Sequence, residues 1–241
     1  MEKNFQVFKD YFGAIIDDCE GSIVYGFENI SKPRTPSFVD IPVEGACYGY
    51  VGEGSVVVHD GDILRTVKQG DYFTTRSNCT ITFLSSKYRV VVWQKVGFDG
   101  MNSIGRVEDS GRLKYIDNCM DSMLSHPIKF GDPCLNALYM PNGVNQTMHT
   151  HPSTRAGYII TGGAKCITPE AVQPLEDGMI FYLPTDKEHK FVTDHNTSAI
   201  MKLVAYHPDS DFGATDEVHP MINRTMVEGV SASNIESIRT K

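Results

Sequence analysis

Short runs of β-branched and aromatic residues, separated by Gly, Asp and Asn, occupy most of this chain and restrict its fold more than any other feature. In the first half the runs are SIVYGF, ACYGYVG, SVVVHD, DYFTT, TITFLSS and YRVVVWQKVG. In the second half they are LNALYMP, VNQTMHTH, AGYIITGGAKCIT, GMIFYLP, HKFVTD and SAIMKLVAYH. Regularly spaced short strands are typical of β-sandwiches and β-barrels. We therefore predict an all-β fold.

The two sets of strands are similar in length and texture, which indicates an internal repeat of one β unit. The less regular stretch FDGMNSIGRVEDSGR, residues 98–112, separates them. We predict an N-terminal unit over residues 1–97, a connector over 98–133 and a C-terminal unit over 134–241. The 241 residues are enough for two small β domains with buried cores.

A short amphipathic helix is predicted over residues 4–17, because five apolar residues recur there at helical spacing. They are Phe5, Phe8, Phe12, Ile15 and Ile16. Such a helix covers one face of a sheet or serves a dimer contact, so a homodimer is one expected assembly. Its other face carries both acids and lysines, which argues against a membrane anchor.

The charge of the chain argues against two classes of partner. The net charge is −8, the isoelectric point is near 5.4, and no run is rich in Lys or Arg. Binding to nucleic acid or to an anionic membrane needs a basic patch. We therefore expect neither partner.

The six cysteines show no CxxC pair and no short recurring spacing, so they predict free thiols rather than a zinc site or a disulfide framework. Thiols of this kind indicate a reducing compartment. The N-terminal residues contain no apolar stretch long enough for a signal peptide or a membrane span. A cytoplasmic location is the resulting expectation.

The segment MHTHPSTRAGYIITGG, residues 148–163, carries the strongest chemical signal. Alternate residues of a strand share a face, so His149, His151 and Arg155 are expected to point the same way. His189 follows 38 residues later, on a neighbouring predicted strand. Three imidazoles that face one point form a facial metal site with open positions for water or substrate. The alternative is a set of ordinary surface histidines.

The spacing of these residues carries a family resemblance. The chain reads Gly143-x5-His149-x-His151-x3-Arg155-x6-Gly162 and then Gly178-x5-Pro184-x4-His189. This pattern resembles the two signature motifs of the cupin superfamily over residues 135–206. The resemblance implies a tandem cupin (a bicupin of double-stranded β-helix, or jelly-roll, barrels) whose C-terminal barrel holds a metal through His149, His151 and His189.

Three positions depart from the cupin motifs. Arg155 stands where the family usually has a glutamate ligand, Asp186 replaces a glycine, and Thr193 replaces an asparagine. The first departure changes the chemistry, because it leaves three neutral imidazoles and no carboxylate on the metal.

The first half resembles the same motifs weakly and lacks the ligands. Gly70-x5-Arg76-x4-Ile81 puts an isoleucine at the histidine position of the second motif. The ligand positions of the first motif fall on Ile41, Val43 and Cys47. We therefore predict a degenerate N-terminal cupin without a metal site.

A three-histidine shell resembles cysteine dioxygenase and related non-heme iron cupins. The resemblance implies Fe(II), a small anionic substrate that supplies the missing negative charge, and dioxygen. Redox-neutral cupins use similar shells with other divalent metals, so Mn, Ni and Zn remain open.

Arg155 is always protonated and cannot ligate a metal. An interior guanidinium needs an anion, and a substrate carboxylate matches its fork geometry. The alternative is that Arg155 turns outward to a surface ion pair.

Other residues extend the candidate site. Strand alternation places His207 at the end of an apolar stripe at the barrel mouth; the stripe is Ala199, Met201, Leu203 and Ala205. The polar segment after Tyr206 is expected to fold back as a lid over the barrel. It would bring Glu217, His219 and Arg224, with His207 and His219 as proton-transfer candidates and Glu217 and Arg224 as substrate contacts. Each of them could equally be an exposed loop residue.

Tyr158 and Tyr182 are pocket candidates that could contact substrate. The alternative is that both are packing residues, which is the more common role of a tyrosine in a strand.

The resulting functional prediction is a metal-dependent dioxygenase or other oxygenase that acts on a small anionic metabolite. One alternative is a redox-neutral isomerase, decarboxylase or lyase that uses the metal as a Lewis acid. The other is a cupin that binds a small ligand without catalysis.

Overall fold

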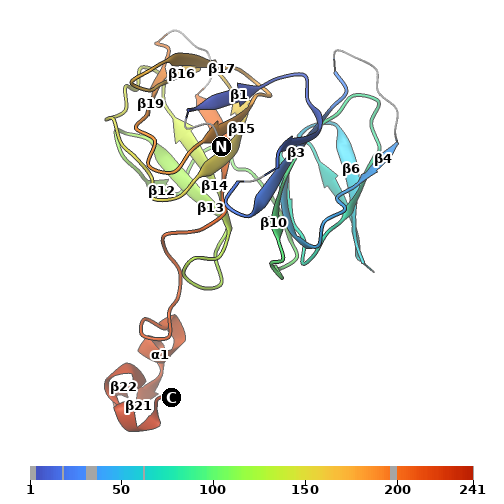
Figure 1. Ribbon diagram of the computed structural model, residues 1–241. Helices are drawn as coiled ribbons and strands as arrows, with labels where there is room; N and C mark the ends of the chain where they lie inside the picture. Colours follow the sequence, from blue (N-terminus) through green and yellow to red (C-terminus); the bar gives the residue numbers. More distant parts are fainter. Residues whose placement is uncertain (1–3, 18, 31–36, 62, 196–199, 241) are drawn as a thin grey trace.

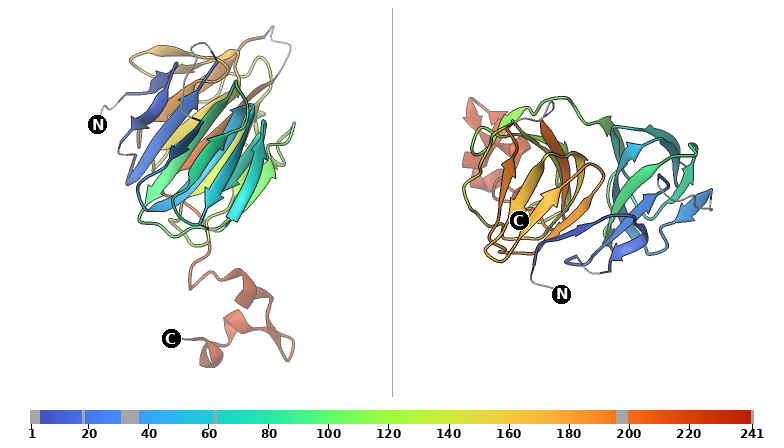
Figure 2. Two further views of the ribbon diagram at one scale, coloured as in Figure 1. Left: turned by 90° about the vertical axis from the view of Figure 1, so that its right-hand side faces the viewer. Right: turned by 90° about the horizontal axis from the view of Figure 1, so that it is seen from above.

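The described strands pair antiparallel and form two barrels that lie side by side (Figure 1; Figure 2, right). This computed structural model describes residues 4–17, 19–30, 37–61, 63–195 and 200–240. Ala199, the first residue of the predicted apolar stripe, lies outside them. The predicted all-β tandem-barrel fold is confirmed.

The N-terminal barrel consists of two sheets. The larger has the order β11-β8-β5-β10-β3-β2 and the smaller the order β4-β9-β6-β7. The larger sheet contains β2 (Phe12–Ile16), β3 (Ser22–Glu28), β5 (Gly45–Glu53), β8 (Asp71–Thr74), β10 (Arg89–Val96) and β11 (Ser103–Arg106). The smaller contains β4 (Phe38–Asp40), β6 (Ser55–Asp60), β7 (Ile63–Lys68) and β9 (Thr80–Phe83).

The C-terminal barrel repeats this arrangement with a seven-stranded and a three-stranded sheet. Their orders are β1-β18-β15-β20-β14-β13-β12 and β17-β16-β19. The larger sheet contains β1 (Gln6–Phe8), β12 (Leu113–Lys114), β13 (Met120–Ser125), β14 (Cys134–Met140), β15 (Arg155–Thr161), β18 (Ile180–Leu183) and β20 (Met201–His207). The smaller contains β16 (Ala164–Ile167), β17 (Val172–Leu175) and β19 (Lys190–Thr193). Residues 98–133, predicted as a connector, therefore contribute β11 to one barrel and β12 and β13 to the other.

The predicted helix over residues 4–17 is wrong. This segment forms β1, which pairs with β18 of the C-terminal barrel, and β2, which pairs with β3 of the N-terminal barrel. Asp10 has φ of 53° and Gly13 has φ of 115°, which are values that an α-helix does not contain. The apolar residues of the segment face different clusters, so the pairing with two sheet edges outweighs their helical spacing.

Two of the three apolar clusters fill the barrels, and the third joins them. Strand alternation separates them: Leu203 and Ala205 of β20 point into the C-terminal barrel, while Val204 and Tyr206 point toward the other barrel. We call the joining cluster the interface core. It contains Tyr11, Cys19, Val24, Ala46, Tyr48, Tyr50, Val91, Trp93, Leu135, Ala156, Tyr158, Ile180, Tyr182, Val204 and Tyr206.

Large aromatic side chains occupy the centre of the interface core. Trp93, from β10, stacks on Tyr206, from β20, with ring centroids 6.1 Å apart and planes 12° apart. The Tyr206 hydroxyl, which is fully buried, lies 2.9 Å from Ser22 Oγ. Burial of this much aromatic surface stabilises the pair of barrels as one unit.

The C-terminal segment leaves the barrels instead of covering them (Figure 1; Figure 2, left). It contains α1 (Pro220–Arg224), the short hairpin β21 (Met226–Val227) with β22 (Val230–Ser231), and two 3₁₀ turns, Ala232–Asn234 and Glu236–Ile238. The predicted lid is therefore wrong. Much of the hydrogen bonding of this arm is internal, because His219 caps α1 and Ala232 N donates to Thr225 O.

The six cysteines are free and buried, as predicted. Within the described residues, no helix combines the length and the apolar character needed to span a bilayer.

A small residue lets the two barrels approach each other at Gly52. A Cβ atom added there would lie 2.0 Å from the hydroxyl oxygen of Tyr158. We expect Gly52→Ala to lower the free energy of unfolding by about 1–3 kcal/mol, because the core must shift to accept the methyl group. Denaturant titration measures this loss. The same substitution should cost less in a Tyr158→Phe background, which lacks that oxygen; equal losses in both backgrounds would contradict the contact.

Candidate metal centre

Backbone hydrogen bonds hold the three histidines in place. His149 and His189 form an isolated bridge in which each backbone N–H donates to the other residue's carbonyl at 3.0 Å. His151 lies two residues further on, and its carbonyl accepts from the N–H of Asp186 at 2.8 Å. Pairing of two segments far apart in the sequence therefore brings the three imidazoles together.

Two departures from the cupin motifs support this local structure. Asp186 has φ of 55°, a left-handed conformation that favours glycine and that Asp tolerates better than most residues. The Thr193 hydroxyl donates to Pro141 O at 2.7 Å and accepts from Val144 N at 2.9 Å. Thr193 thus ties β19 to the turn that precedes the histidine pair.

Hydrogen bonds fix the tautomers of two of the rings. His149 Nδ1 lies 2.8 Å from Thr147 O, and His189 Nδ1 lies 3.0 Å from Lys187 O. A carbonyl can only accept, so both Nδ1 atoms carry the proton and both Nε2 atoms carry a lone pair. His189 Nε2 is buried without a hydrogen-bond partner. A buried lone pair of this kind fits a metal ligand.

The histidines form one compact group. One candidate ligand nitrogen from each ring can be chosen so that all three lie within 4.8 Å of one another. The ring centroids are 4.5–5.1 Å apart. Within the described ranges this is the one group of three or more His, Cys, Asp or Glu side chains with such geometry. A three-histidine site of this type suits a divalent metal.

The surroundings keep two of the imidazoles neutral. Burial, assisted by the charge of Arg155, lowers the pKa of His151 to about 3. Burial also lowers the pKa of His189 to about 4, assisted by His149 and Arg155. Metal ligation needs the neutral ring, so these two ligands require no deprotonation at neutral pH.

Two of the three histidines, His151 and His189, line a cavity of about 210 Å³ inside the C-terminal barrel. Its apolar wall consists of Leu138, Phe181, Leu183, Phe191, Leu203, Ala205 and Phe212. Its polar wall consists of Tyr115, Asp121, Asn136, His151, Arg155, His189, His207 and Asp211. This volume is smaller than that of pockets for drug-sized ligands, so it suits a small metabolite.

Arg155 lines the cavity and is 7% exposed, so it does not turn outward. Its Nη1 donates to Ser153 O at 2.8 Å and to Thr154 O at 3.0 Å, and its Nη2 lies 3.2 Å from Asp211 Oδ2. The guanidinium therefore already has an intramolecular anion. Asp211 lies just beyond β20 and was not predicted.

His207 also lines the cavity, as predicted, and belongs to a chain of three polar side chains. His207 Nε2 lies 2.8 Å from Asn136 Oδ1, and Asn136 Nδ2 donates to Asp121 Oδ2 at 2.6 Å. Asn136 and Asp121 were missed. Strand alternation contains the signal for Asn136, because it shares the inward parity of Leu138 and Met140 in an otherwise apolar strand.

Two predicted pocket residues lie elsewhere. Tyr158 and Tyr182 belong to the interface core and point away from the cavity. Side chains alternate between the two faces of β15. Because Arg155 points into the barrel, Tyr158, three residues later, points out of it. Tyr158 instead meets Arg89, of the N-terminal barrel, through a side-chain hydrogen bond.

The predicted lid residues do not reach the cavity either. Glu217 and His219 line a separate groove beside Ile128 and Phe130, at the base of the C-terminal arm. Arg224 lies on α1 of the same arm. His219 Nδ1 accepts from the backbone of Met221, so this ring serves as a helix cap.

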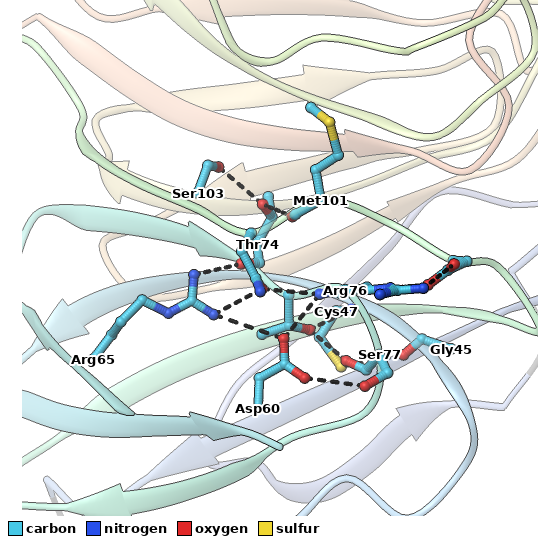
Figure 3. A network of polar contacts seen from close by, with 12 residues as sticks. Gly45, Cys47, Asp60, Arg65, Thr74, Arg76, Ser77, Met101 and Ser103 are labelled. Atoms are coloured by element: carbon cyan, nitrogen blue, oxygen red, sulfur yellow. Dashed lines mark hydrogen bonds and ion pairs between the residues drawn. The ribbon is translucent and has the colours of Figure 1, made fainter. Parts of the chain in front are cut away.

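The N-terminal barrel lacks an equivalent site. Ile41, Cys47 and Ile81, at predicted ligand positions, are buried in its apolar core. A polar network surrounds Asp60 in this barrel (Figure 3). Asp60 accepts from Arg76 N and Ser77 Oγ, and Arg65 lies 3.9 Å from it. Among the described residues of this barrel, no group of three metal-ligating side chains forms.

Sequence similarity to a known protein family lies in the C-terminal half of the chain. Residues 137–206 match the family model of the Cupin domain. No curated protein matches the chain significantly.

Several solved structures share the fold over most of the chain. Protein Ylba from E. coli has 16% identity and a TM-score of 0.59, over 88% of this chain and 93% of that one. A variant of Bacillus subtilis oxalate decarboxylase has 12% identity and a TM-score of 0.55, over 90% and 81%. A salicylate 1,2-dioxygenase from Pseudaminobacter salicylatoxidans has 9% identity and a TM-score of 0.57, over 79% and 72%. At these identities the likeness concerns the fold.

Asp121 provides a pH-dependent test of the cavity. Burial raises its pKa from 3.8 to about 6, against the opposing hydrogen bond from Asn136. The folded state therefore binds more protons than the unfolded state between about pH 4 and 6, and stability falls as pH rises through this window.

We expect Asp121→Asn to remove the loss of stability that accompanies deprotonation of Asp121. From pH 4 to pH 8, the free energy of unfolding of the variant should rise by about 1–3 kcal/mol relative to that of the wild type. Chemical denaturation at both pH values measures it. Asp109→Asn, at a fully exposed carboxylate, is the control. A pH-independent difference for Asp121→Asn would show that this carboxyl is not perturbed.

Proposed function

We propose that the C-terminal barrel, which matches the Cupin domain over residues 137–206, is a metal-dependent enzyme that oxidises a small anionic metabolite with dioxygen. The observation that carries the proposal is the set of three imidazoles, with no carboxylate in the cluster, two of which line a small and mostly apolar cavity. Fe(II) is the metal that we assign to it.

His149, His151 and His189 would hold the ion. Two of these rings are oriented by backbone carbonyls, and the buried His189 Nε2 has no other partner. Three neutral ligands leave the full charge of a divalent ion uncompensated, so the site favours an anionic substrate. A bound ferrous ion would supply the redox chemistry that dioxygen requires.

Arg155 would bind the anionic group of the substrate. Its Nη2 faces Asp211, whose side chain is 42% exposed and lies at the edge of the cavity. An entering carboxylate would replace Asp211 on this nitrogen, while the bonds from Nη1 to Ser153 and Thr154 keep the guanidinium in place. The apolar wall would exclude water from the bound substrate.

The proposed reaction places both atoms of dioxygen in the product, so it needs no external reductant. Oxygen uptake by Fe(II)-loaded protein, with a panel of small carboxylic acids, tests it. One oxygen consumed per substrate oxidised supports the proposal. Product formation without oxygen consumption would favour the second candidate.

The second candidate is a redox-neutral isomerase, decarboxylase or lyase that uses a divalent metal as a Lewis acid. One observation favours it: the cavity contains Asp121, whose pKa is raised to about 6, in a hydrogen-bonded chain with His207. A group that titrates near neutral pH is suited to proton transfer.

Metal content tests the ligand set. We expect one divalent ion per chain, and His149→Ala or His189→Ala should reduce the content to well below half, since each removes a ligand. Elemental analysis of reconstituted protein measures this. His207→Ala is a matched control: it removes a cavity histidine outside the cluster and should leave the metal content unchanged. Equal losses in all three variants would contradict the assignment.

Anion affinity tests Arg155. We expect Arg155→Ala to retain the metal and to weaken binding of small carboxylates about 10- to 100-fold, the effect of losing about 1.5–3 kcal/mol. Asp211→Asn should strengthen binding, because it removes the internal competitor for the guanidinium. Calorimetric titration with lactate and malonate measures both. Unchanged affinity in both variants would exclude Arg155 from substrate binding.

A further inference from the structure

One atom on the polar wall of the cavity has no partner. Asp121 Oδ1 is buried and accepts no hydrogen bond, although Oδ2 of the same group accepts from Asn136. A buried carboxylate oxygen without a donor destabilises the folded state, and native proteins contain few such atoms. The carboxylate lines the same cavity as His151, His189 and Arg155.

The polarity of the side-chain network shows what this wall offers. Asn136 must donate to Asp121 through Nδ2, because an ionised carboxylate only accepts. Asn136 Oδ1 therefore faces His207, and the Nε2 of His207 carries the donated hydrogen. Asn136 directs a hydrogen to Oδ2 and His207 directs its hydrogen to Asn136, so neither residue donates to Asp121 Oδ1. This part of the wall thus offers an anionic oxygen that can accept a hydrogen bond.

The cavity wall carries groups of opposite character. The histidine cluster and Arg155 form a site for an anion, while Asp121 is a site for a hydrogen-bond donor. A plain carboxylic acid would satisfy only the site for the anion. The small volume, about 210 Å³, requires both functions on one small molecule.

We propose that Asp121 selects the substrate: the cavity binds a small carboxylic acid that also carries a hydroxyl or protonated amino group, and Asp121 Oδ1 accepts the hydrogen of that group. This inference rests on the proposed function, because the carboxylate is assigned to the metal and Arg155. It adds the substrate class, a hydroxy or amino acid, and a residue that determines specificity.

Matched pairs of acids test the proposal on protein loaded with Zn(II), which cannot turn over with oxygen. The probes are lactate, 3-hydroxypropionate, alanine and β-alanine, each compared with propionate, which lacks the donor. Calorimetric titration should show at least one donor-bearing acid binding ten-fold or more tightly than propionate. If all four bind no better than propionate, the proposal is wrong.

The variant Asp121→Asn tests the residue. It keeps an oxygen that can accept from Asn136 and presents an amide donor in place of Oδ1. The preference for the donor-bearing acid should fall to within about two-fold of propionate, and propionate affinity itself should change little. Asp109→Asn, a surface control, should leave the preference intact. A preference that survives in Asp121→Asn, or an equal loss for every acid, would overturn the assignment.

Elemental analysis of the same preparation separates the two levels of inference. Absence of bound zinc counts against the metal centre. The titrations are then repeated on metal-free protein, in which Arg155 and Asp121 remain. If Asp121→Asn still reduces the preference for donor-bearing acids over propionate, the role of Asp121 holds independently of the metal centre.

Discussion

The alternation of side chains along β15 and β20 determines both the assembly and the site. These strands are buried on both faces: one set of side chains packs against the other barrel and the next set lines the cavity. The face of the strand on which a residue lies therefore decides whether its side chain packs between the barrels or lines the cavity. Arg155 and His207 have the inward parity, whereas Tyr158 and Tyr206 belong to the interface core.

The strand pattern and the resemblance to the cupin motifs predicted the fold and the histidine cluster, because both follow from residue types and spacings that the sequence displays directly. One residue, Thr150, separates His149 from His151 on an extended segment, and the turn at Asp186 leads to His189, which pairs with His149. The N-terminal helix failed for the opposite reason. Its apolar spacing is local, but the partners of β1 and β2 lie in two different sheets.

The rest of the cavity depends on contacts that spacing does not reveal. Asp121 and Asn136 reach the site because β13 and β14 are neighbours of β20 in the sheet. Asp211 reaches it because the chain just beyond β20 passes the barrel mouth. The lid failed because the arm satisfies its own backbone, with His219 as a cap. The two barrels also show that one fold accepts a metal site or a solid core, since Ile41 and Ile81 fill the space in the first.

The pairing of β1 with β18 has a consequence for synthesis of the chain. Gln6 faces Tyr182, 176 positions later, so the edge strand of the C-terminal barrel leaves the ribosome long before its partner exists. During that interval the apolar residues around β1, Phe5 among them, have no burial site in their own barrel. Such long-range pairing slows folding and prolongs the exposure of an apolar, aggregation-prone strand. The residues of β1 are thus among the last to reach their final place, and a nascent chain would need protection of this segment.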